Sequence, residues 1–154
     1  MYRVLILLLS VAALPAVAQP RASDLVEWRV RADRTAPGAE ARVVLDATIA
    51  PGWRLYALDS PVGIPLTIAF DALPSGVRAG RVAQAEAREG YDAVFESKYP
   101  YFAGTGRVVQ RLHVGEGVAA GTHEVAGAVR FAVCDDQICL PPTRRAFRVP
   151  LVVE

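Results

Sequence analysis

The stretch Ala41-Arg-Val-Val-Leu-Asp-Ala-Thr-Ile49 alternates between apolar and polar side chains. Its odd-numbered positions from Val43 onward are apolar, whereas Arg42 and Asp46 fall between them. In an extended chain, successive side chains point to opposite faces, so this pattern gives one apolar face and one polar face. The stretch therefore predicts a β-strand that lies with one face on a hydrophobic core.

The same period of two recurs along most of the chain. It is clearest in three further segments, residues 107–114, 124–133 and 147–153. Shorter strand candidates, separated by turns rich in glycine and proline, are residues 25–30, 53–58, 66–70 and 80–86. About eight short strands at regular turn spacing predict an all-β sandwich.

Pro150 and residues 83–88 add two further expectations to this strand pattern. Pro150 lies inside the last alternating segment, and a proline cannot donate a ladder hydrogen bond, so this strand is expected at a sheet edge. Residues 83–88 have an alternative interpretation as a short helix.

The first 18 residues are typical of a secretory signal peptide. Arg3 gives a positive start, residues 4–14 are almost wholly apolar, and Ala16-Val-Ala18 has the small-x-small pattern that precedes cleavage. The apolar run is shorter than the roughly 20 residues of a transmembrane helix, which leaves an uncleaved anchor as the second interpretation. We expect a signal peptide at residues 1–18 and one domain at residues 19–154, with no stable membrane insertion after cleavage.

Charge is evenly balanced along the chain. There are 17 basic and 16 acidic residues, and the net charge is +1. This balance argues against a nucleic-acid partner and against a polybasic lipid-binding patch. An exported protein enters an oxidising compartment, so its two cysteines are able to pair.

Both cysteines lie in the motif Val133-Cys134-Asp-Asp-Gln-Ile-Cys139-Leu-Pro-Pro142. A predicted strand runs directly into Cys134 and the four intervening residues are turn-like, which places the two cysteines near the mouth of a hairpin. A bridge over so short a loop would stabilise the fold by only about 2 kcal/mol. From spacing alone, a structural disulfide and a redox-active pair are about equally supported.

The local chemistry qualifies the redox interpretation. The motif is not a Cys-x-x-Cys at a helix N-terminus, and Asp135 and Asp136 disfavour a thiolate. The pair would be a slow nucleophile unless a partner brings its own reactive thiolate or a lid controls access. A metal site would need more ligands, and the only histidines, His113 and His123, are far away in sequence. No metal and no other cofactor is expected.

Residues 90–102 are rich in aromatic side chains, and no period fits them well. One interpretation is a surface loop whose rings fold onto the core. The other is a lid or binding loop, because long irregular loops in compact domains are often functional.

Several motifs in a fixed order cover nearly all of the chain after residue 18. They are Ala50-Pro-Gly-Trp-Arg-Leu-Tyr56, Ser60-Pro61, Gly63-Ile-Pro-Leu66, residues 92–95 with Tyr101-Phe102, and residues 131–142. Together they resemble the N-terminal periplasmic domain of the DsbD family of thiol–disulfide interchange proteins. The cysteine motif followed by Leu-Pro-Pro is the specific one among them.

The resemblance implies an immunoglobulin-like β-sandwich with a cap loop over a redox-active cysteine pair. Cys139 would form the mixed disulfide with partners, and Cys134 would resolve it. Better-known members of the family have one more residue between the two cysteines, which affects the turn more than the chemistry.

The resemblance also implies which residues surround the pair. In the family, an aromatic ring of the cap loop covers the disulfide. Phe95 is the candidate for that ring, with Asp92 beside it and Tyr91 as the alternative. Tyr56 matches an aromatic position that lines the site.

The family further implies a periplasmic location and a relay of electrons. A membrane-embedded reductase supplies them through a thioredoxin-like domain, and periplasmic disulfide isomerases and cytochrome c maturation proteins receive them. We expect no membrane domain and no thioredoxin-like domain after Glu154, so either the reductase and the thioredoxin-like partners are separate polypeptides or the domain has acquired another role. The expected protein is a monomeric, stoichiometric redox carrier more than an enzyme with a small substrate.

Two other functions stay open from the sequence. One is a periplasmic binding or assembly domain in which the disulfide is only a structural staple. The other, more remote, is a metal chaperone, against which the small number of ligands argues.

Overall fold

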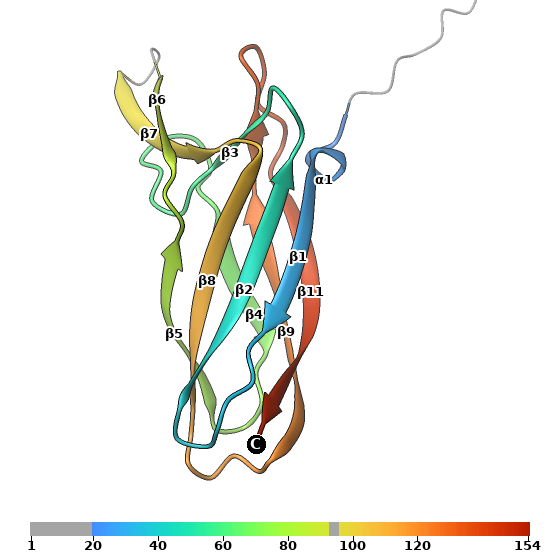
Figure 1. Cartoon of the computed structure of the whole chain (residues 1–154). Coiled ribbons are helices and arrows are strands. Elements are labelled where there is room, and N and C mark those ends of the chain that lie inside the picture. The colour runs from blue at the N-terminus through green and yellow to red at the C-terminus, as the bar shows by residue number, and fades with distance from the viewer. Residues whose placement is uncertain (1–19, 93–95) are drawn as a thin grey trace, which may run out of the picture.

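Two antiparallel sheets pack face to face, as the computed structural model in Figure 1 shows. The structure describes residues 20–92 and 96–154. The first sheet has the strand order β1 (Val26–Ala32), β2 (Glu40–Ile49), β8 (Thr105–Val114), β5 (Val77–Gln84). The second sheet has the order β11 (Thr143–Val153), β9 (Gly121–Phe131), β4 (Thr67–Ala72). A four-residue helix, α1 (Ala22–Leu25), precedes β1.

A third, smaller sheet lies at one end of the sandwich, at the top of Figure 1. Its strands pair in the order β10 (Val133–Cys134), β3 (Arg54–Tyr56), β7 (Ser97–Phe102), β6 (Arg88–Asp92). The strands β6 and β7 form a hairpin that extends from this end. The third sheet therefore connects the strand of Cys134 to the aromatic segment through continuous backbone pairing.

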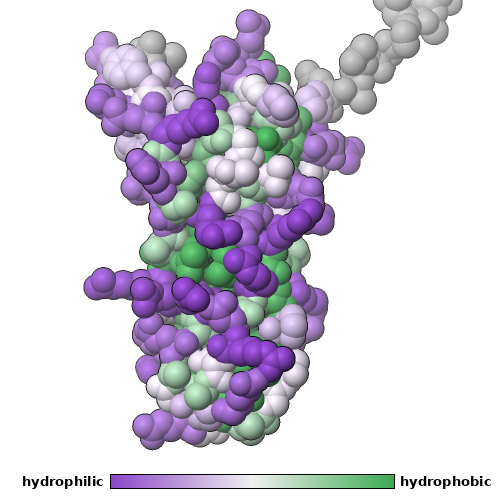
Figure 2. Space-filling model, in the orientation of Figure 1, coloured by the Kyte–Doolittle hydropathy of each residue, from purple (hydrophilic) through white to green (hydrophobic). Residues whose placement is uncertain are grey.

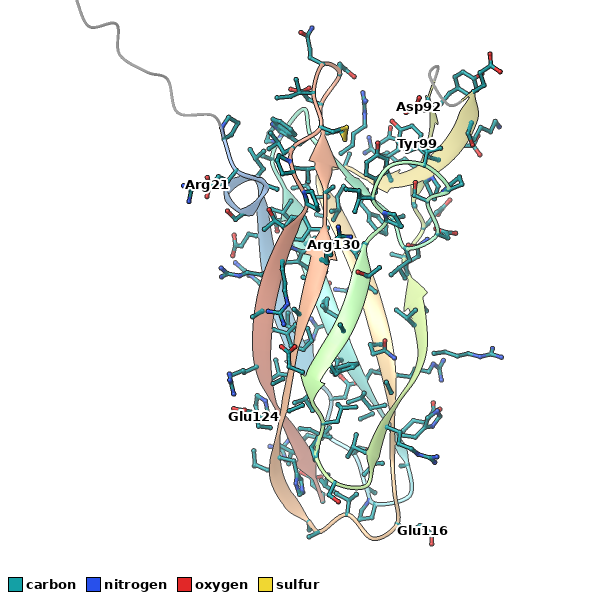
Figure 3. All side chains as sticks on the ribbon, turned by 180° about the vertical axis from the view of Figure 1, so that it is seen from behind. Arg21, Asp92, Tyr99, Glu116, Glu124 and Arg130 are labelled. Carbon is teal, nitrogen blue, oxygen red and sulfur yellow. A yellow bond between two sulfur atoms is a disulfide. The ribbon has the colours of Figure 1, made fainter. Side chains whose placement is uncertain are left out.

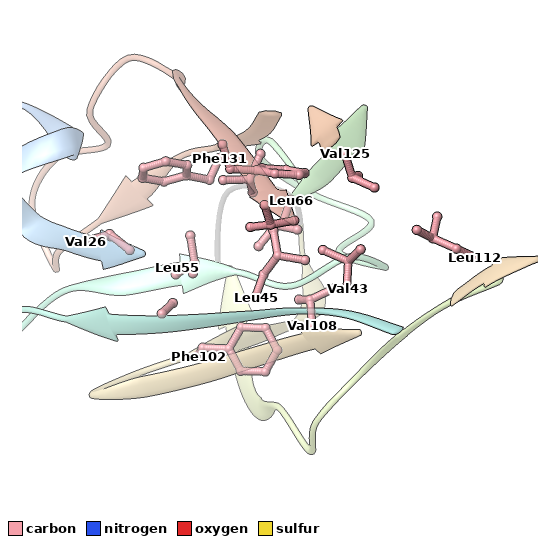
Figure 4. Close-up of a cluster of buried hydrophobic side chains, with 14 of the residues drawn as sticks. Val26, Val43, Leu45, Leu55, Leu66, Phe102, Val108, Leu112, Val125 and Phe131 are labelled. Carbon is pink, nitrogen blue, oxygen red and sulfur yellow. The ribbon is translucent and has the colours of Figure 1, made fainter. Parts of the chain in front are cut away.

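The core lies between the two large sheets. The odd-numbered apolar residues of β2 and the even-numbered residues of β8 are buried, as their alternation predicts. Leu45, Leu112 and Phe131 are fully buried, and Figure 4 shows the side chains of both sheets meeting there. At about 25 cal/mol for each Å² of apolar surface removed from water, burial of this face is what holds the sheets together.

Most strand predictions are confirmed, and the all-β sandwich with them. β11, which carries Pro150, lies at the edge of its sheet as predicted. The alternation in β9 holds only in part, because Ala126 and Ala128 are buried together with Val125 and Val129. β9 is the central strand of its sheet, and a methyl side chain with strands on both sides offers little surface to solvent.

Two sequence-based interpretations are wrong. Residues 83–88 are not a helix, because β5 continues to Gln84 and β6 begins at Arg88. The described residues of the range 90–102 do not form an irregular loop, because β6 and β7 pair in register from Arg88 with Tyr101 to Asp92 with Ser97. Backbone pairing, more than a buried apolar face, defines this hairpin, which is why no hydrophobic period marks it.

Hydrophilic side chains cover most of the face seen in Figure 2, around a hydrophobic region midway along it. Within residues 20–92 and 96–154, no helix has the length and apolar character needed to span a membrane. The predicted signal peptide, residues 1–18, lies outside the described residues.

Candidate functional site

The two cysteines form a disulfide across a tight β-turn, with an S–S distance of 2.02 Å and a Cα–Cα distance of 4.0 Å. The backbone N–H of Leu140 donates to the carbonyl of Val133 at 2.9 Å, and that of Asp135 donates to the carbonyl of Ile138 at 3.0 Å. These bonds flank the cysteines, which form an isolated antiparallel bridge between them. They are thus a non-hydrogen-bonded pair, the position in an antiparallel ladder where opposed residues come closest.

The turn between the cysteines is fixed by its own first residue. Oδ1 of Asp135 accepts hydrogen bonds from the backbone N–H groups of Gln137 and Ile138, both at 2.7 Å. This side chain imitates a backbone turn, as aspartate does at turn starts. The two bonds hold the pKa of the Asp135 carboxyl below its ordinary value. The Asp135 carboxylate therefore stabilises the turn by binding its backbone N–H groups.

The two cysteine residues differ in their exposure to solvent. Cys134 is 7% exposed, whereas Cys139 belongs to the exposed part of the turn. Ile138, the residue before Cys139, is an exposed large hydrophobic side chain. A protein that approaches the turn therefore meets Cys139 beside an apolar side chain, with Cys134 behind it.

Strand register brings five polar and aromatic residues to one face of the third sheet. Cys134 lies opposite Cys139 on one side and opposite Arg54 on the other. Two residues after Arg54, Tyr56 lies opposite Tyr101 of β7. Directly opposed residues and residues two apart point to the same face of a sheet. The disulfide, Arg54 and the two tyrosines therefore share a face.

The hairpin adds to the same face. Tyr99 is two residues before Tyr101 and lies opposite Gly90, and Asp92 is two residues after Gly90. Figure 3 shows Asp92 and Tyr99 at the same end of the molecule as the sulfur atoms. Tyr91 alternates with these residues, lies on the opposite face of the hairpin and is 63% exposed.

Tyr56 touches the disulfide directly. Its phenolic oxygen lies 3.6 Å from Sγ of Cys134 and 4.0 Å from Sγ of Cys139. Disulfide sulfurs carry no hydrogen, so the hydroxyl is the donor in these contacts. Burial raises the pKa of the Tyr56 phenol above its ordinary value, and Tyr99 and Asp92 act in the same direction, against Arg54. The phenol therefore keeps its proton and can donate at neutral pH.

The ring of Tyr56 is held on two sides. A Cβ atom at Gly63 would lie 2.5 Å from the Tyr56 ring, so the glycine backbone is packed against it. On another side, the ring of Tyr99 lies 5.4 Å from it, centroid to centroid, in the tilted arrangement that aromatic pairs favour. These contacts fix where the hydroxyl points.

Arg54 joins the cysteine turn to the hairpin. Its guanidinium forms an ion pair with Asp136 of the turn and lies over the ring of Tyr101, 5.6 Å from the centroid. The hydrogen bond to Asp136 raises the pKa of Arg54 above its ordinary value. An aromatic face attracts a guanidinium at this separation.

The structure brings some of the predicted site residues together and leaves others apart. Cys134, Cys139 and Tyr56 are in contact, and Asp92 is near enough for its charge to act on Tyr56. Tyr91 lies on the other face of the hairpin, and Phe95, the candidate cap ring, lies outside the described residues.

Arg54 and Tyr99 also belong to the site, and the sequence alone did not indicate either of them. The signal that could have found them is the two-residue period of a strand. Arg54 is two residues before Tyr56 and shares its face, and Tyr99 stands in the same relation to Tyr101. The partner strands of these segments are not evident from one sequence.

In the part of the chain that the structure describes, no cluster of three His, Cys, Asp or Glu residues is arranged to hold a metal ion. His113 lies 3.2 Å from a carboxylate oxygen of Glu40, and Nε2 of His123 lies 2.7 Å from the carbonyl oxygen of Ala119. Both histidines thus have partners away from the disulfide.

Comparison with known proteins identifies proteins that are similar to this chain. A family model described as the N-terminal domain of the thiol:disulfide interchange protein DsbD matches residues 22–151. The fold is similar to the reduced N-terminal domain of Neisseria meningitidis DsbD, with a TM-score of 0.54 and 17% identity over 75% of this chain and 82% of that one. No curated protein sequence is similar enough to count as a match.

A second similar structure is the N-terminal periplasmic domain of ScsB from Proteus mirabilis. The TM-score is 0.57 and the identity 13%, over 88% of this chain and 49% of that one. This chain therefore spans about half of that domain. At these identities the likeness shows the fold, and it confirms the predicted immunoglobulin-like sandwich.

Proposed function

This chain belongs to the family of DsbD N-terminal domains, and we propose that its Cys134–Cys139 pair exchanges disulfides with partner proteins. The observation that carries this proposal is the unequal exposure of the two cysteine residues. Cys139 is exposed at the base of a turn, while Cys134 is buried against the hydroxyl of Tyr56. Thiol–disulfide exchange depends on which sulfur the attacking thiolate can reach, and the exposed Cys139 offers such a sulfur while the buried Cys134 does not.

Electrons enter in two steps. A thiolate of the donor attacks Sγ of Cys139, the Cys134–Cys139 bond breaks, and its electron pair leaves on Cys134. A second donor thiolate then attacks the donor sulfur of the mixed disulfide, and Cys139 leaves. The donor becomes a disulfide, and this chain becomes a dithiol that has taken up two electrons and two protons.

Tyr56 assists the first step. The sulfur of Cys134 is the leaving group, and the phenolic oxygen of Tyr56 lies 3.6 Å from it, within reach for its hydroxyl to donate. A hydrogen bond to a developing thiolate lowers the basicity of the leaving group, and a less basic thiol leaves faster.

Delivery to an acceptor runs the same chemistry in reverse. The Cys139 thiolate attacks an acceptor disulfide and forms a mixed disulfide, with one acceptor thiolate released. Cys134 then attacks Sγ of Cys139, which restores the intramolecular bridge and frees the second acceptor thiolate. The domain acts in this scheme as a carrier of electron pairs between proteins.

We infer the partners and the compartment from the family. The donor is a thioredoxin-like protein supplied by a membrane-embedded thiol reductase, and the acceptors are periplasmic proteins with reducible disulfides, including proteins of cytochrome c biogenesis. The signal peptide proposed at residues 1–18 is consistent with the periplasm, and the domain at residues 19–154 would be monomeric there.

The competing function is a binding domain with a structural staple. The bridge joins cysteines five residues apart, so it restricts the unfolded chain little, by about 2 kcal/mol. A bridge that served mainly to stabilise the sandwich would contribute more stability if it joined distant strands. Its position at an exposed turn favours the exchange function.

The test is to trap the mixed disulfide. Oxidised chain is incubated with a thioredoxin variant that retains only its attacking cysteine, and non-reducing gel electrophoresis reports the covalent complex. We expect a complex through Cys139, which peptide mass mapping would identify. In a Cys134→Ala variant whose Cys139 carries a 5-thio-2-nitrobenzoate mixed disulfide, the thioredoxin thiolate should attack Sγ of Cys139, form the same complex and release thionitrobenzoate.

The matched control is Cys139→Ala, which keeps the turn and leaves the buried sulfur. Its Cys134 is charged with 5-thio-2-nitrobenzoate in the same way, and we expect little or no complex with the thioredoxin while its circular dichroism stays unchanged. Complexes that form equally well with Cys139→Ala would show that the assignment of the two cysteines is wrong. No complex with the oxidised chain would favour the staple.

A further inference from the structure

Arg54 occupies a central place in the face that carries the disulfide. It lies directly opposite Cys134 in the third sheet, and its guanidinium pairs with Asp136, two residues after Cys134. The same guanidinium lies over the ring of Tyr101 on β7. The side chain is one-third exposed, at 33%, whereas that of Asp136 is 79% exposed. An exposed carboxylate on a turn is thus held by an arginine that is itself packed on the hairpin.

We propose that Arg54 is a positioning residue of the exchange site, which neutralises Asp136 beside the sulfurs and ties the cysteine turn to Tyr101. This inference rests on the exchange function proposed above. It assigns to Arg54 a role that acts on the cysteine pair through Asp136 and the turn.

The charges around the pair explain why such a residue is needed. Reduction creates a site for a thiolate next to Asp135 and Asp136, and Asp92 contributes negative charge near Tyr56. Like charges disfavour an ionised thiol. Asp135 is bonded to the turn backbone, and Tyr56, whose pKa is raised by burial, is neutral. Arg54 supplies the positive charge that offsets Asp136, so the thiolate forms more readily than the two aspartates alone would allow.

Arginine suits this position better than lysine. A guanidinium is planar, so it can lie over Tyr101 and still direct N–H groups to a carboxylate at its edge. An ammonium is a compact point charge without this geometry. The charge of lysine would remain, but the link between the turn and the hairpin would be weaker.

The test measures the ionisation of Cys139 in the whole chain carrying Cys134→Ala, which leaves a single thiol. The rate of alkylation by iodoacetamide is followed from pH 5 to 10. In this background, Arg54→Met should move the midpoint to higher pH by about half a unit to one unit, and lower the rate near pH 7 by about three- to tenfold. Arg54→Lys should fall between Arg54→Met and the parent.

Asp136→Asn and the double variant Arg54→Met with Asp136→Asn separate the effect of charge on the thiol from a structural effect of losing Arg54. Asp136→Asn should move the midpoint to lower pH, and Arg54→Met with Asp136→Asn should lie close to the parent, because both partners of the ion pair are gone. The control is Arg148→Met, which removes an arginine paired with Glu124 on β9, away from the turn. It should leave the profile unchanged.

An unchanged midpoint in a folded Arg54→Met variant would overturn the inference while leaving exchange by the wild-type chain intact. If Arg54→Met does not fold, Asp136→Asn decides, and the absence of a downward shift overturns the inference. Failure of the wild-type disulfide to exchange with any thiol would instead refute the proposed function.

Discussion

The hydroxyl oxygen of Tyr56 lies 3.6 Å from Sγ of Cys134, although 78 residues separate the two in the chain. The contact arises because β3 pairs with β10 and places Arg54 opposite Cys134, so that Tyr56 projects from the same face two residues later. A proton donor is thereby fixed beside the buried sulfur of the exchange site.

Tyr56→Phe should slow the reduction of the disulfide by about two- to tenfold, the range that one hydrogen bond of 0.5–1.4 kcal/mol gives. The phenyl ring still packs against Gly63 and Tyr99, so the fold should be kept. The rate is measured by reduction with dithiothreitol, followed by mass after quenching with acid. Tyr91→Phe removes a phenol from the opposite face of the hairpin and should change nothing; an equal loss in both variants would refute a specific role for Tyr56.

Gly63→Ala tests how firmly the ring of Tyr56 is held. Gly63 has φ of 71°, and an added Cβ would come within 2.5 Å of the ring. Gly52 has φ of 83° with nothing within 4 Å, so Gly52→Ala introduces only the backbone cost of about 1–2 kcal/mol. We expect Gly63→Ala to cost more than Gly52→Ala in urea unfolding, and to alter the rate of disulfide reduction, which Gly52→Ala should leave alone. Equal values for the two variants would show that the ring is free to move.

Much of the sandwich could be predicted from the sequence because burial on one face imposes a visible alternation. Val43 and Leu45 on β2, and Val108 and Leu112 on β8, reveal their strands without knowledge of any partner. The β6–β7 hairpin escaped prediction because it projects from the sandwich and is defined by backbone pairing.

The site was predictable only where a motif or a family resemblance marked it. The cysteines and Tyr56 fall into that group. The pairing of Arg54 with Asp136 spans 82 residues, and it depends on a register between strands that one sequence does not reveal. The difference in exposure between Cys134 and Cys139 is likewise a property of the folded turn.

Asp46→Asn should lower stability at neutral pH. Asp46 accepts hydrogen bonds from Arg107 and Arg31 on the outer face of the first sheet, and the bond from Arg107 above all holds its pKa below the ordinary value of 3.8. Since the carboxylate is partly exposed, we expect a loss of up to about 1 kcal/mol in urea unfolding.

The pH dependence of that loss follows from the lowered pKa. A carboxyl with a lowered pKa in the folded state stabilises the protein fully above its unfolded value, and loses this contribution as pH falls through the folded value. The difference between wild type and Asp46→Asn should therefore be constant near neutral pH and shrink below about pH 4. Glu27→Gln, in an exposed pair with Arg29, is the control and should have little effect; a difference that grew on acidification would contradict the account.

The most direct test of the exchange function is the reduction potential of the Cys134–Cys139 disulfide, measured by equilibrating the purified protein in thiol redox buffers. We predict a value between about −270 and −180 mV, the range from thioredoxin to protein disulfide isomerase, in which a dithiol can both accept and deliver electrons. A value well below about −300 mV would mark a permanent structural bridge and would contradict the proposal that this pair carries electrons between proteins.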